Sequence, residues 1–512
     1  MQDISERVRY FFVKNGWKIL FVFISFIIIS FFCVHVRHQF LTDTVGKPVD
    51  LTVKLIVLAC GCLFLLLIMV LVLFRINEIL LMAGMLLALM FVFMRITPVG
   101  EVPDEYHHFY RAYEISQGSL VSRHLGDEGV GGNYLPSAIE EYENEMAEID
   151  ENDTKAVEFG NTALYAPVSY LPQVIGIKIA DLFTDNVSDL FCAGRFANAL
   201  TAFVLCVWAL VMVPFGRKLL FIPMLFPLSL QEMISLSPDA LTISLSMAFL
   251  AYILHLSYVS ECVRKRDIII LALMGTVISL CKIVYVVLLL LVFMIPESKF
   301  KDRKHSYQVK LGLMAGAIII NLIWLAISAG YLVEFNEGVN SAEQVKYVLT
   351  HIPEFYATCV QTVITHFATR LPNMIGSNMG TLSITTTGTM WLMFIIFIVY
   401  EFCTVNDNPY KVHKYDCLIL IGVFLIGTAL IFASLYVQWT PVGKDLIDGT
   451  QGRYFTPLMG CFAFFVMFMR QIKLRQQENA AAVQEYGTYY YMLLGCFNLI
   501  TVIDVIQYYI IN

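Results

Sequence analysis

Long apolar runs separated by short polar segments dominate this chain. A run of about 20 apolar residues is long enough for a helix to cross about 30 Å of hydrocarbon. Counting such runs predicts an all-α integral membrane protein with about thirteen transmembrane helices. The predicted spans are residues 18–36, 52–74, 78–95, 190–213, 217–232, 238–258, 268–282, 284–297, 311–330, 386–403, 416–437, 455–470 and 488–508.

Composition strengthens this interpretation and excludes several function classes. Of 512 residues, 58% are hydrophobic and only 15% are charged, and the mean hydropathy is +0.70. The net charge of −7 offers no basic surface for nucleic acid. The 12 cysteines lie mostly inside apolar runs and form no CxxC with histidine partners, so they are predicted to pack in the core rather than form disulfides or a zinc site.

Basic residues in the short loops predict the orientation. Lysines and arginines gather in the segments 217–218, 264–266, 299–310, 411–414 and 470–475, which alternate with less basic loops. The positive-inside rule makes that side cytoplasmic, together with the N-terminus. The outer loops are then residues 97–188, 331–385 and 438–454, and the C-terminus is outside. Residues 1–77 are predicted to form an N-terminal cytoplasmic segment and two extra transmembrane helices, followed by a main transmembrane domain over 78–512.

The first outer loop contains one segment that the apolar pattern leaves ambiguous. Residues 163–182 are apolar enough to span but contain two prolines, Lys178 and Asp181. Counting them as a span would place the following basic loops on the wrong side, so we predict a juxtamembrane amphipathic helix on the outer surface. The acidic stretch from Glu140 to Glu158 is expected to be a solvated helical face rather than a metal cage.

The start of that loop carries the first candidate site. Its polar residues are Asp104, Glu105, His107, His108 and Arg111. If Pro103 opens a helix, Asp104, His107, His108 and Arg111 fall on one face. Carboxylates in a first helical turn often act only as caps. Five polar groups beside a bilayer instead favour a site in which an ionised carboxylate is a general base and the other groups bind substrate.

Two further motifs supply candidate ligands. Ser237-Pro238-Asp239 lies between two spans on the predicted outer side, where Asp239 is either a cap or part of the site. Gly449 to Pro457 includes Arg453 and Tyr454 at the start of a late span, and an arginine there can bind a phosphate with two hydrogen bonds. The alternative is an arginine that reaches for lipid headgroups. Lys282 is a second candidate phosphate ligand, because a lysine inside a span requires a partner; Arg195 and Arg370 are weaker candidates.

These motifs together resemble a known family. Pro-Asp-Glu-x-x-His, Ser-Pro-Asp and Gln-Gly-Arg-Tyr-Phe-x-Pro, in this order, resemble DUF2142, an uncharacterised bacterial family of multispanning membrane proteins, over roughly residues 80–500. That family is similar in layout to the GT-C glycosyltransferases, which transfer sugars from polyprenyl-phosphate carriers and use an acidic residue of the first outer loop. The resemblance implies a GT-C-like fold, with Asp104 as the base and Glu105 as its neighbour or as a ligand of a divalent cation. It also implies that Arg453 and Lys282 hold the carrier phosphate.

The sequence therefore predicts a membrane glycosyltransferase at the outer face of a bacterial cytoplasmic membrane. The donor is a polyprenyl-phosphate-linked sugar and the acceptor is a cell-wall or surface polysaccharide. A transporter or flippase of lipid-linked glycan is one alternative, although no internal repeat of the kind common in transporters is evident. A polysaccharide polymerase or ligase is another. No P-loop, GxGxxG, HExxH or GxSxG motif is present.

Overall fold

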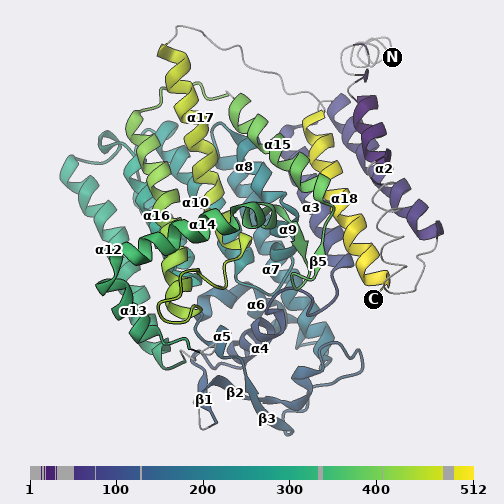
Figure 1. The fold of residues 1–512 in the computed structure, drawn as a ribbon, viewed down its shortest axis with the longest axis vertical. Coiled ribbons are helices and arrows are strands. Elements are labelled where there is room, and N and C mark those ends of the chain that lie inside the picture. Colours follow the sequence, from purple (N-terminus) through teal and green to yellow (C-terminus); the bar gives the residue numbers. More distant parts are fainter. Residues whose placement is uncertain are drawn as a thin grey trace.

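A computed structural model describes residues 13, 16–17, 19–28, 30, 51–74, 76–126, 130–331, 338–405, 407–476 and 489–511, most of them in helices (Figure 1). The long helices are α2 (Leu51–Leu73), α3 (Glu78–Ile96), α7 (Val187–Met212), α10 (Asp239–Tyr258), α11 (Lys265–Cys281), α12 (Arg303–Ser328), α14 (Ile352–Ile375), α15 (Gly388–Thr404), α16 (Lys414–Gln438), α17 (Met459–Gln476) and α18 (Tyr489–Ile511). All but α14 coincide with predicted spans.

Fewer helices than predicted are long and apolar enough to cross a membrane. In the described ranges seven qualify: Glu78–Ile96, Val187–Met212, Asp239–Tyr258, Arg303–Tyr331, Lys414–Gln438, Gly452–Lys473 and Tyr490–Tyr509. Shorter apolar helical stretches cover Ile19–Ile28, Leu58–Leu73, Ile283–Met294 and Trp391–Thr404. The first predicted span, 18–36, falls largely outside the described residues. The structure thus supports a helical membrane protein without establishing thirteen spans.

One predicted span is interrupted, and the interruption has a physical cause. Residues 217–232 form two short helices, α8 (Arg217–Met224) and α9 (Pro227–Met233). Pro227 is the first residue of α9. A proline lacks the backbone N–H and disfavours helical backbone in the residue before it, and Phe226 is accordingly extended. Residues 283–294 form a 3₁₀ helix, η3 (Ile283–Met294), which follows a break at Lys282.

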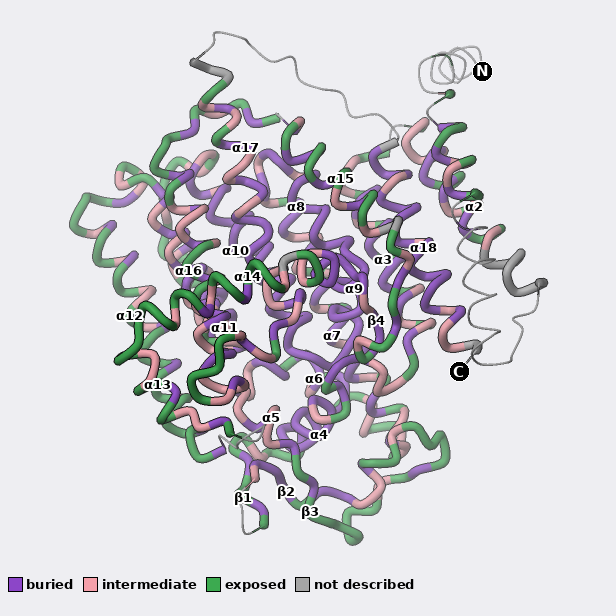
Figure 2. Tube along the Cα trace, viewed as in Figure 1, coloured by how far each residue is buried: buried purple, intermediate pink, exposed green. Residues whose placement is uncertain are grey.

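Helix α10 is the centre of the bundle. Nearly all of its side chains are buried (Figure 2), and it packs against α7, α9, α11 and η3. A helix that is apolar all round is suited to such a position. Its small hydroxyl residues let neighbours approach closely, and Ser244 bonds to the backbone oxygen of Ala240 at 2.7 Å. The residue at its N-terminal end, Asp239, is therefore fixed by the packing of the whole helix.

A small mixed subdomain lies at one end of the molecule, at the bottom of the view in Figure 1. It contains α4 (Glu105–Ser116) and an antiparallel sheet in the order β1-β2-β3, formed by β1 (Arg123–Leu125), β2 (Val130–Pro136) and β3 (Thr154–Glu158). The 3₁₀ helix η1 (Ser137–Glu140) follows β2. The chain is therefore not purely α-helical. The prediction of a helical face over Glu140 to Glu158 is wrong, because turns and β3 occupy this stretch.

Short helices flank the bundle near that end. The predicted juxtamembrane segment is divided into α5 (Gly160–Ala163), η2 (Pro167–Tyr170) and α6 (Leu171–Ala180). Helix α6 has 10 residues, too few to cross a bilayer. It packs on α7 where Gly176 meets the Ala193 oxygen, at a distance that leaves no room for a Cβ atom. The remaining elements are η4 (Glu297–Lys299), η5 (Ala329–Tyr331), α13 (Ser341–Thr350), the β4–β5 hairpin (Asn378–Met379 and Ile384–Thr385) and η6 (Gly452–Leu458).

Candidate functional site

Asp104 precedes α4 in a conformation that few non-glycine residues adopt. Its backbone is left-handed, with φ 61° and ψ 13°, and Leu382 is the only other described non-glycine residue with positive φ. Aspartate and asparagine tolerate this region better than other side chains. The Asp104 side chain makes no capping hydrogen bond and is 47% exposed. Its carboxylate is therefore available for a role other than capping.

Glu105 has a structural role in this arrangement. Its carboxylate is fully buried and accepts two hydrogen bonds from Arg195, at 2.7 and 2.5 Å. The same carboxylate accepts a hydrogen bond from the Leu236 N–H at 3.1 Å. Arg195 also donates to the backbone oxygens of Thr97 and Pro98. Glu105 thus ties α4 to α7 and to the loop before α10, and it does not line the cavity described below.

Hydrogen bonds to the loop before α10 fix the position of Asp239. The side chain of Asn198 donates to the backbone oxygens of Ser235 and Ser237, at 2.7 and 3.1 Å. The Asp239 N–H donates to the Ser237 hydroxyl at 3.1 Å. The carboxylate of Asp239 forms a buried ion pair with Lys282. Lys282 reaches it because the chain leaves α11 there with extended backbone, φ −152° and ψ 120°.

Arg453 belongs to η6 and lies in the same region, because η6 packs against the end of α14. The Gly452 N–H donates to the Asn373 side chain at 3.0 Å. A Cβ at Gly452 would lie 2.1 Å from the Met374 nitrogen, so only glycine allows this approach. Tyr454 lies between the two cations, with its ring centroid 4.7 Å from the Lys282 ammonium and 5.5 Å from the Arg453 guanidinium carbon.

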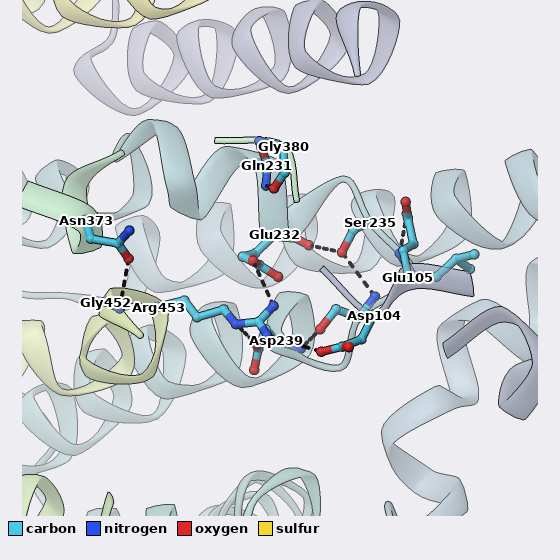
Figure 3. Close-up of polar contacts among 12 residues, drawn as sticks. Asp104, Glu105, Gln231, Glu232, Ser235, Asp239, Asn373, Gly380, Gly452 and Arg453 are labelled. Carbon is cyan, nitrogen blue, oxygen red and sulfur yellow. Dashed lines mark hydrogen bonds and ion pairs between the residues drawn. The ribbon is translucent and has the colours of Figure 1, made fainter. Parts of the chain in front are cut away.

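Arg453 is surrounded by three carboxylates (Figure 3). Its Nη1 donates to Glu232 Oε1 at 3.2 Å. Nη2 lies 3.6 Å from Asp104 Oδ2, and Nε lies 3.6 Å from Asp239 Oδ2. Glu232 is fully buried and Arg453 is 6% exposed. Among the described residues, Arg453 Nε and Glu232 Oε2 lack any hydrogen-bond partner. Buried polar atoms without partners are rare in native proteins and frequently mark binding sites.

A cavity of about 230 Å³ opens onto this cluster. Asp104, Asp239, Lys282 and Arg453 all line it, although they are far apart in sequence. The lining also includes apolar side chains, namely Ile283 and Val284 of η3, Leu325 of α12, and Ile431 and Leu435 of α16, as well as polar ones such as Ser328 and Gln438. The cavity thus combines charged groups with apolar side chains from η3, α12 and α16.

The remaining residues of α4 have different positions. His108 lines the cavity and hydrogen-bonds through Nδ1 to the Tyr170 hydroxyl at 2.8 Å. Burial lowers the pKa of His108 to about 3, so its ring is neutral at physiological pH. His107 lies outside the cavity lining, and burial lowers its pKa too, although nearby Asp104 opposes the shift.

Arg111 is not brought to the cavity. It is fully buried, forms an ion pair with Glu114, and donates to the Ser122 hydroxyl at 3.0 Å and to the Leu120 oxygen at 2.8 Å. The predicted common face of α4 is therefore divided, because Asp104 and His108 face the cavity while Arg111 points into the outer subdomain. Arg370 bonds to the Thr450 hydroxyl at 3.0 Å and also lies outside the cavity lining.

Glu232 and Tyr165 also belong to this region, although neither was predicted from the sequence. Glu232 lies inside the predicted span 217–232, and a carboxylate in an apolar segment was an available signal of function. Tyr165 lines the cavity, and burial raises its pKa to about 12, so it remains a neutral hydrogen-bonding group. Its sequence context gave no signal, since tyrosines at membrane interfaces are common.

The arrangement can bind an anion and accept a proton in one place. Arg453 and Lys282 present positive charge to the cavity, and Asp104 presents a partly exposed carboxylate. In the described part of the chain, no group of three or more histidine, cysteine or acidic side chains is placed to hold a metal ion. Asp104 and Asp239 face guanidinium and ammonium groups instead.

Comparison with known proteins gives one match. Residues 136–461, more than half of the chain, match the family described as "Predicted membrane protein (DUF2142)". The matched region contains Asp239, Lys282 and Arg453 and begins after Asp104. It is narrower than the range suggested by the sequence motifs. No curated protein and no solved structure matches the chain.

Proposed function

The chain belongs to the DUF2142 family of predicted membrane proteins, and we propose that it is a membrane glycosyltransferase. It takes a sugar from a polyprenyl-phosphate carrier and transfers it to a hydroxyl of a cell-wall or surface polysaccharide. The observation that carries this proposal is the composition of the cavity. Two cations and two carboxylates, of which Asp104 is partly exposed, line it together with apolar side chains of η3, α12 and α16. A lipid-linked, charged substrate likewise combines charged and apolar parts.

The donor fits this cavity in one orientation. Its phosphate lies against Arg453 and Lys282, since a guanidinium binds phosphate oxygens with paired hydrogen bonds and an ammonium neutralises their charge. Its first isoprene units lie against Ile283, Ile431 and Leu435, which are apolar residues of the cavity lining. The sugar then lies near Asp104. The aromatic rings of Tyr165 and Tyr454 line the same space and offer flat surfaces for a sugar ring.

Transfer follows from these positions. The acceptor hydroxyl oxygen attacks the anomeric carbon and forms the new glycosidic bond, while the bond from that carbon to the phosphate oxygen breaks. Asp104 takes the hydroxyl proton, and positioned bases of this kind contribute roughly 10²–10⁴-fold to rates. The electron pair of the broken bond stays on the departing phosphate. Arg453 and Lys282 stabilise that negative charge in a region with little water.

We propose that the reaction takes place at the outer face of a bacterial cytoplasmic membrane, with the N-terminus cytoplasmic and the C-terminus outside. The loops carrying the site belong to the less basic side of the bundle. We expect a cysteine at Glu145, an exposed loop position, to react with a membrane-impermeant thiol reagent in intact cells. A cysteine at Lys304 should react only after the membrane is opened. The unaltered chain is the control for its native cysteines, and the reverse labelling pattern would contradict an outer-face reaction.

A deletion strain tests the proposed reaction in cells. Loss of the transferase should remove one sugar decoration from the surface glycan and leave its polyprenyl-phosphate donor unused. Mass spectrometry of surface glycans and of the lipid extract, with parent and complemented strains as controls, measures both. Unchanged glycans together with an unchanged pool of lipid-linked sugars would count against the proposal.

A further inference from the structure

Only Nη1 of the Arg453 guanidinium donates a hydrogen bond within the described residues, to Glu232, but carboxylates lie around all three of its nitrogens. Each of its three nitrogens faces a carboxylate: Nη1 faces Glu232 at 3.2 Å, Nη2 faces Asp104 at 3.6 Å, and Nε faces Asp239 at 3.6 Å. Arginine binds phosphate well only when two neighbouring N–H groups point at it. A phosphate that binds such a pair therefore competes with at least one of the three carboxylates for the place beside the guanidinium.

Two of the three carboxylates are held firmly. Glu232 lies in the short helix α9 and is fully buried. Of the three carboxylates, it alone accepts a hydrogen bond from the guanidinium. Asp239 is buried, sits at the first turn of the central helix α10, and keeps its own ion pair with Lys282. Moving either one would leave a charge buried without a partner, which is strongly unfavourable.

The third carboxylate, Asp104, is the one that can leave. Its side chain is 47% exposed, and its contact with Arg453 is an ion pair of 3.6 Å rather than a hydrogen bond. Its other side-chain contact is a long bond of 3.4 Å from Asn161. It also lies at the exposed start of α4, so rotation of its side chain moves it into water. Hydration then compensates for the lost pairing.

We propose that the donor phosphate displaces Asp104 from Arg453, so that Asp104 becomes available as a base only when donor is bound. The inference rests on the proposed function and adds an order of events to it. Before the donor binds, Asp104 is paired with a cation and a nearby hydroxyl is not activated. Once phosphate has taken its place on Nη2, Asp104 is free beside the sugar. Glu232 acts as a positioning residue that holds the guanidinium during the exchange.

The exchange predicts that removing the Asp104 charge strengthens phosphate binding. The probe is farnesyl phosphate, a short isoprenoid monophosphate, with affinity for the purified full-length protein measured by isothermal titration in detergent. Asp104→Asn should bind about fivefold more tightly than the unaltered protein, the effect expected for removing one partly exposed ion pair. Asp104→Gly, which also suits the left-handed backbone, should give the same gain. Glu232→Gln keeps the Asp104 carboxylate at Nη2, so its gain should be smaller than that of Asp104→Asn.

The outcomes separate the inference from the function on which it rests. Binding that depends on Arg453 but is equal in the unaltered protein and in Asp104→Asn overturns the exchange and leaves the transferase proposal standing. A gain confined to Glu232→Gln shows that the wrong carboxylate was chosen and also overturns it. If the unaltered protein does not bind the probe, or Arg453→Gln binds it equally well, the phosphate site and the proposed function fail together.

Discussion

Cells that carry Asp104→Asn are expected to lose nearly all of the glycan decoration while the protein accumulates in the membrane at its normal level. Asparagine has the same size as aspartate and adopts left-handed backbone at least as readily, so the turn before α4 is kept. The carboxylate forms no capping hydrogen bond that would be lost. What disappears is the proton acceptor, at a loss of roughly 10²–10⁴-fold in rate.

The measurement compares surface glycans by mass spectrometry at matched membrane abundance, with the unaltered gene in the same deletion background as the reference. Asn161→Ala is a useful comparison, because it removes the long 3.4 Å contact to Asp104 and shortens one side chain of the cavity lining but leaves the carboxylate in place. Normal glycans from Asp104→Asn at normal abundance would remove Asp104 from the mechanism and leave it as a residue of the turn.

The neighbouring carboxylate is expected to give the opposite phenotype. Glu105→Gln should lower the stability of the protein by about 3–5 kcal/mol, the range for breaking a buried ion pair and leaving its partner charged. Arg195 would remain buried without a counter-charge, and the tie between α4 and α7 would weaken. Thermal unfolding of the purified protein in detergent measures the effect, and membrane abundance should fall in parallel.

Asp104→Asn serves as the matched control in that experiment, since it changes the adjacent carboxylate in the same way. Its unfolding temperature should stay close to that of the unaltered protein. A Glu105→Gln protein of normal stability that has lost all transfer would reverse the two roles and make Glu105 the base.

The positions of the helices could be predicted from the sequence because each reflects a local property. A run of apolar residues is sufficient to identify α3, α7, α10 and α16, and the structure places them within a few residues of the predicted spans. The interruption was harder to predict. The stretch 217–232 has enough apolar character for a span, yet packing and Pro227 divide it into α8 and α9. A hydropathy average over about 20 residues does not detect a break of this kind.

The site was predictable where a polar residue stands out against an apolar surrounding, as at Lys282 and Arg453. Those residues indeed meet Asp104 and Asp239 at one cavity. Helical spacing alone could not show that Asp104 faces the cavity and Arg111 does not. The surroundings of each side chain depend on what packs around the helix. Glu114 and Ser122 draw Arg111 into the outer subdomain. Likewise, the buried partner of Glu105 comes from α7, 90 residues away, and no local pattern reveals it.

The most direct test of the central claim is the fate of the lipid-linked sugar when the purified protein acts on it in detergent. The lipid extract and the undecorated surface glycan of the deletion strain supply donor and acceptor. Detergent solution has no compartments, so a transporter or flippase would leave both unchanged. The account predicts that the unaltered protein releases polyprenyl phosphate and adds the sugar to the glycan, while Asp104→Asn does neither. Absence of both products with the stable, unaltered protein would contradict it.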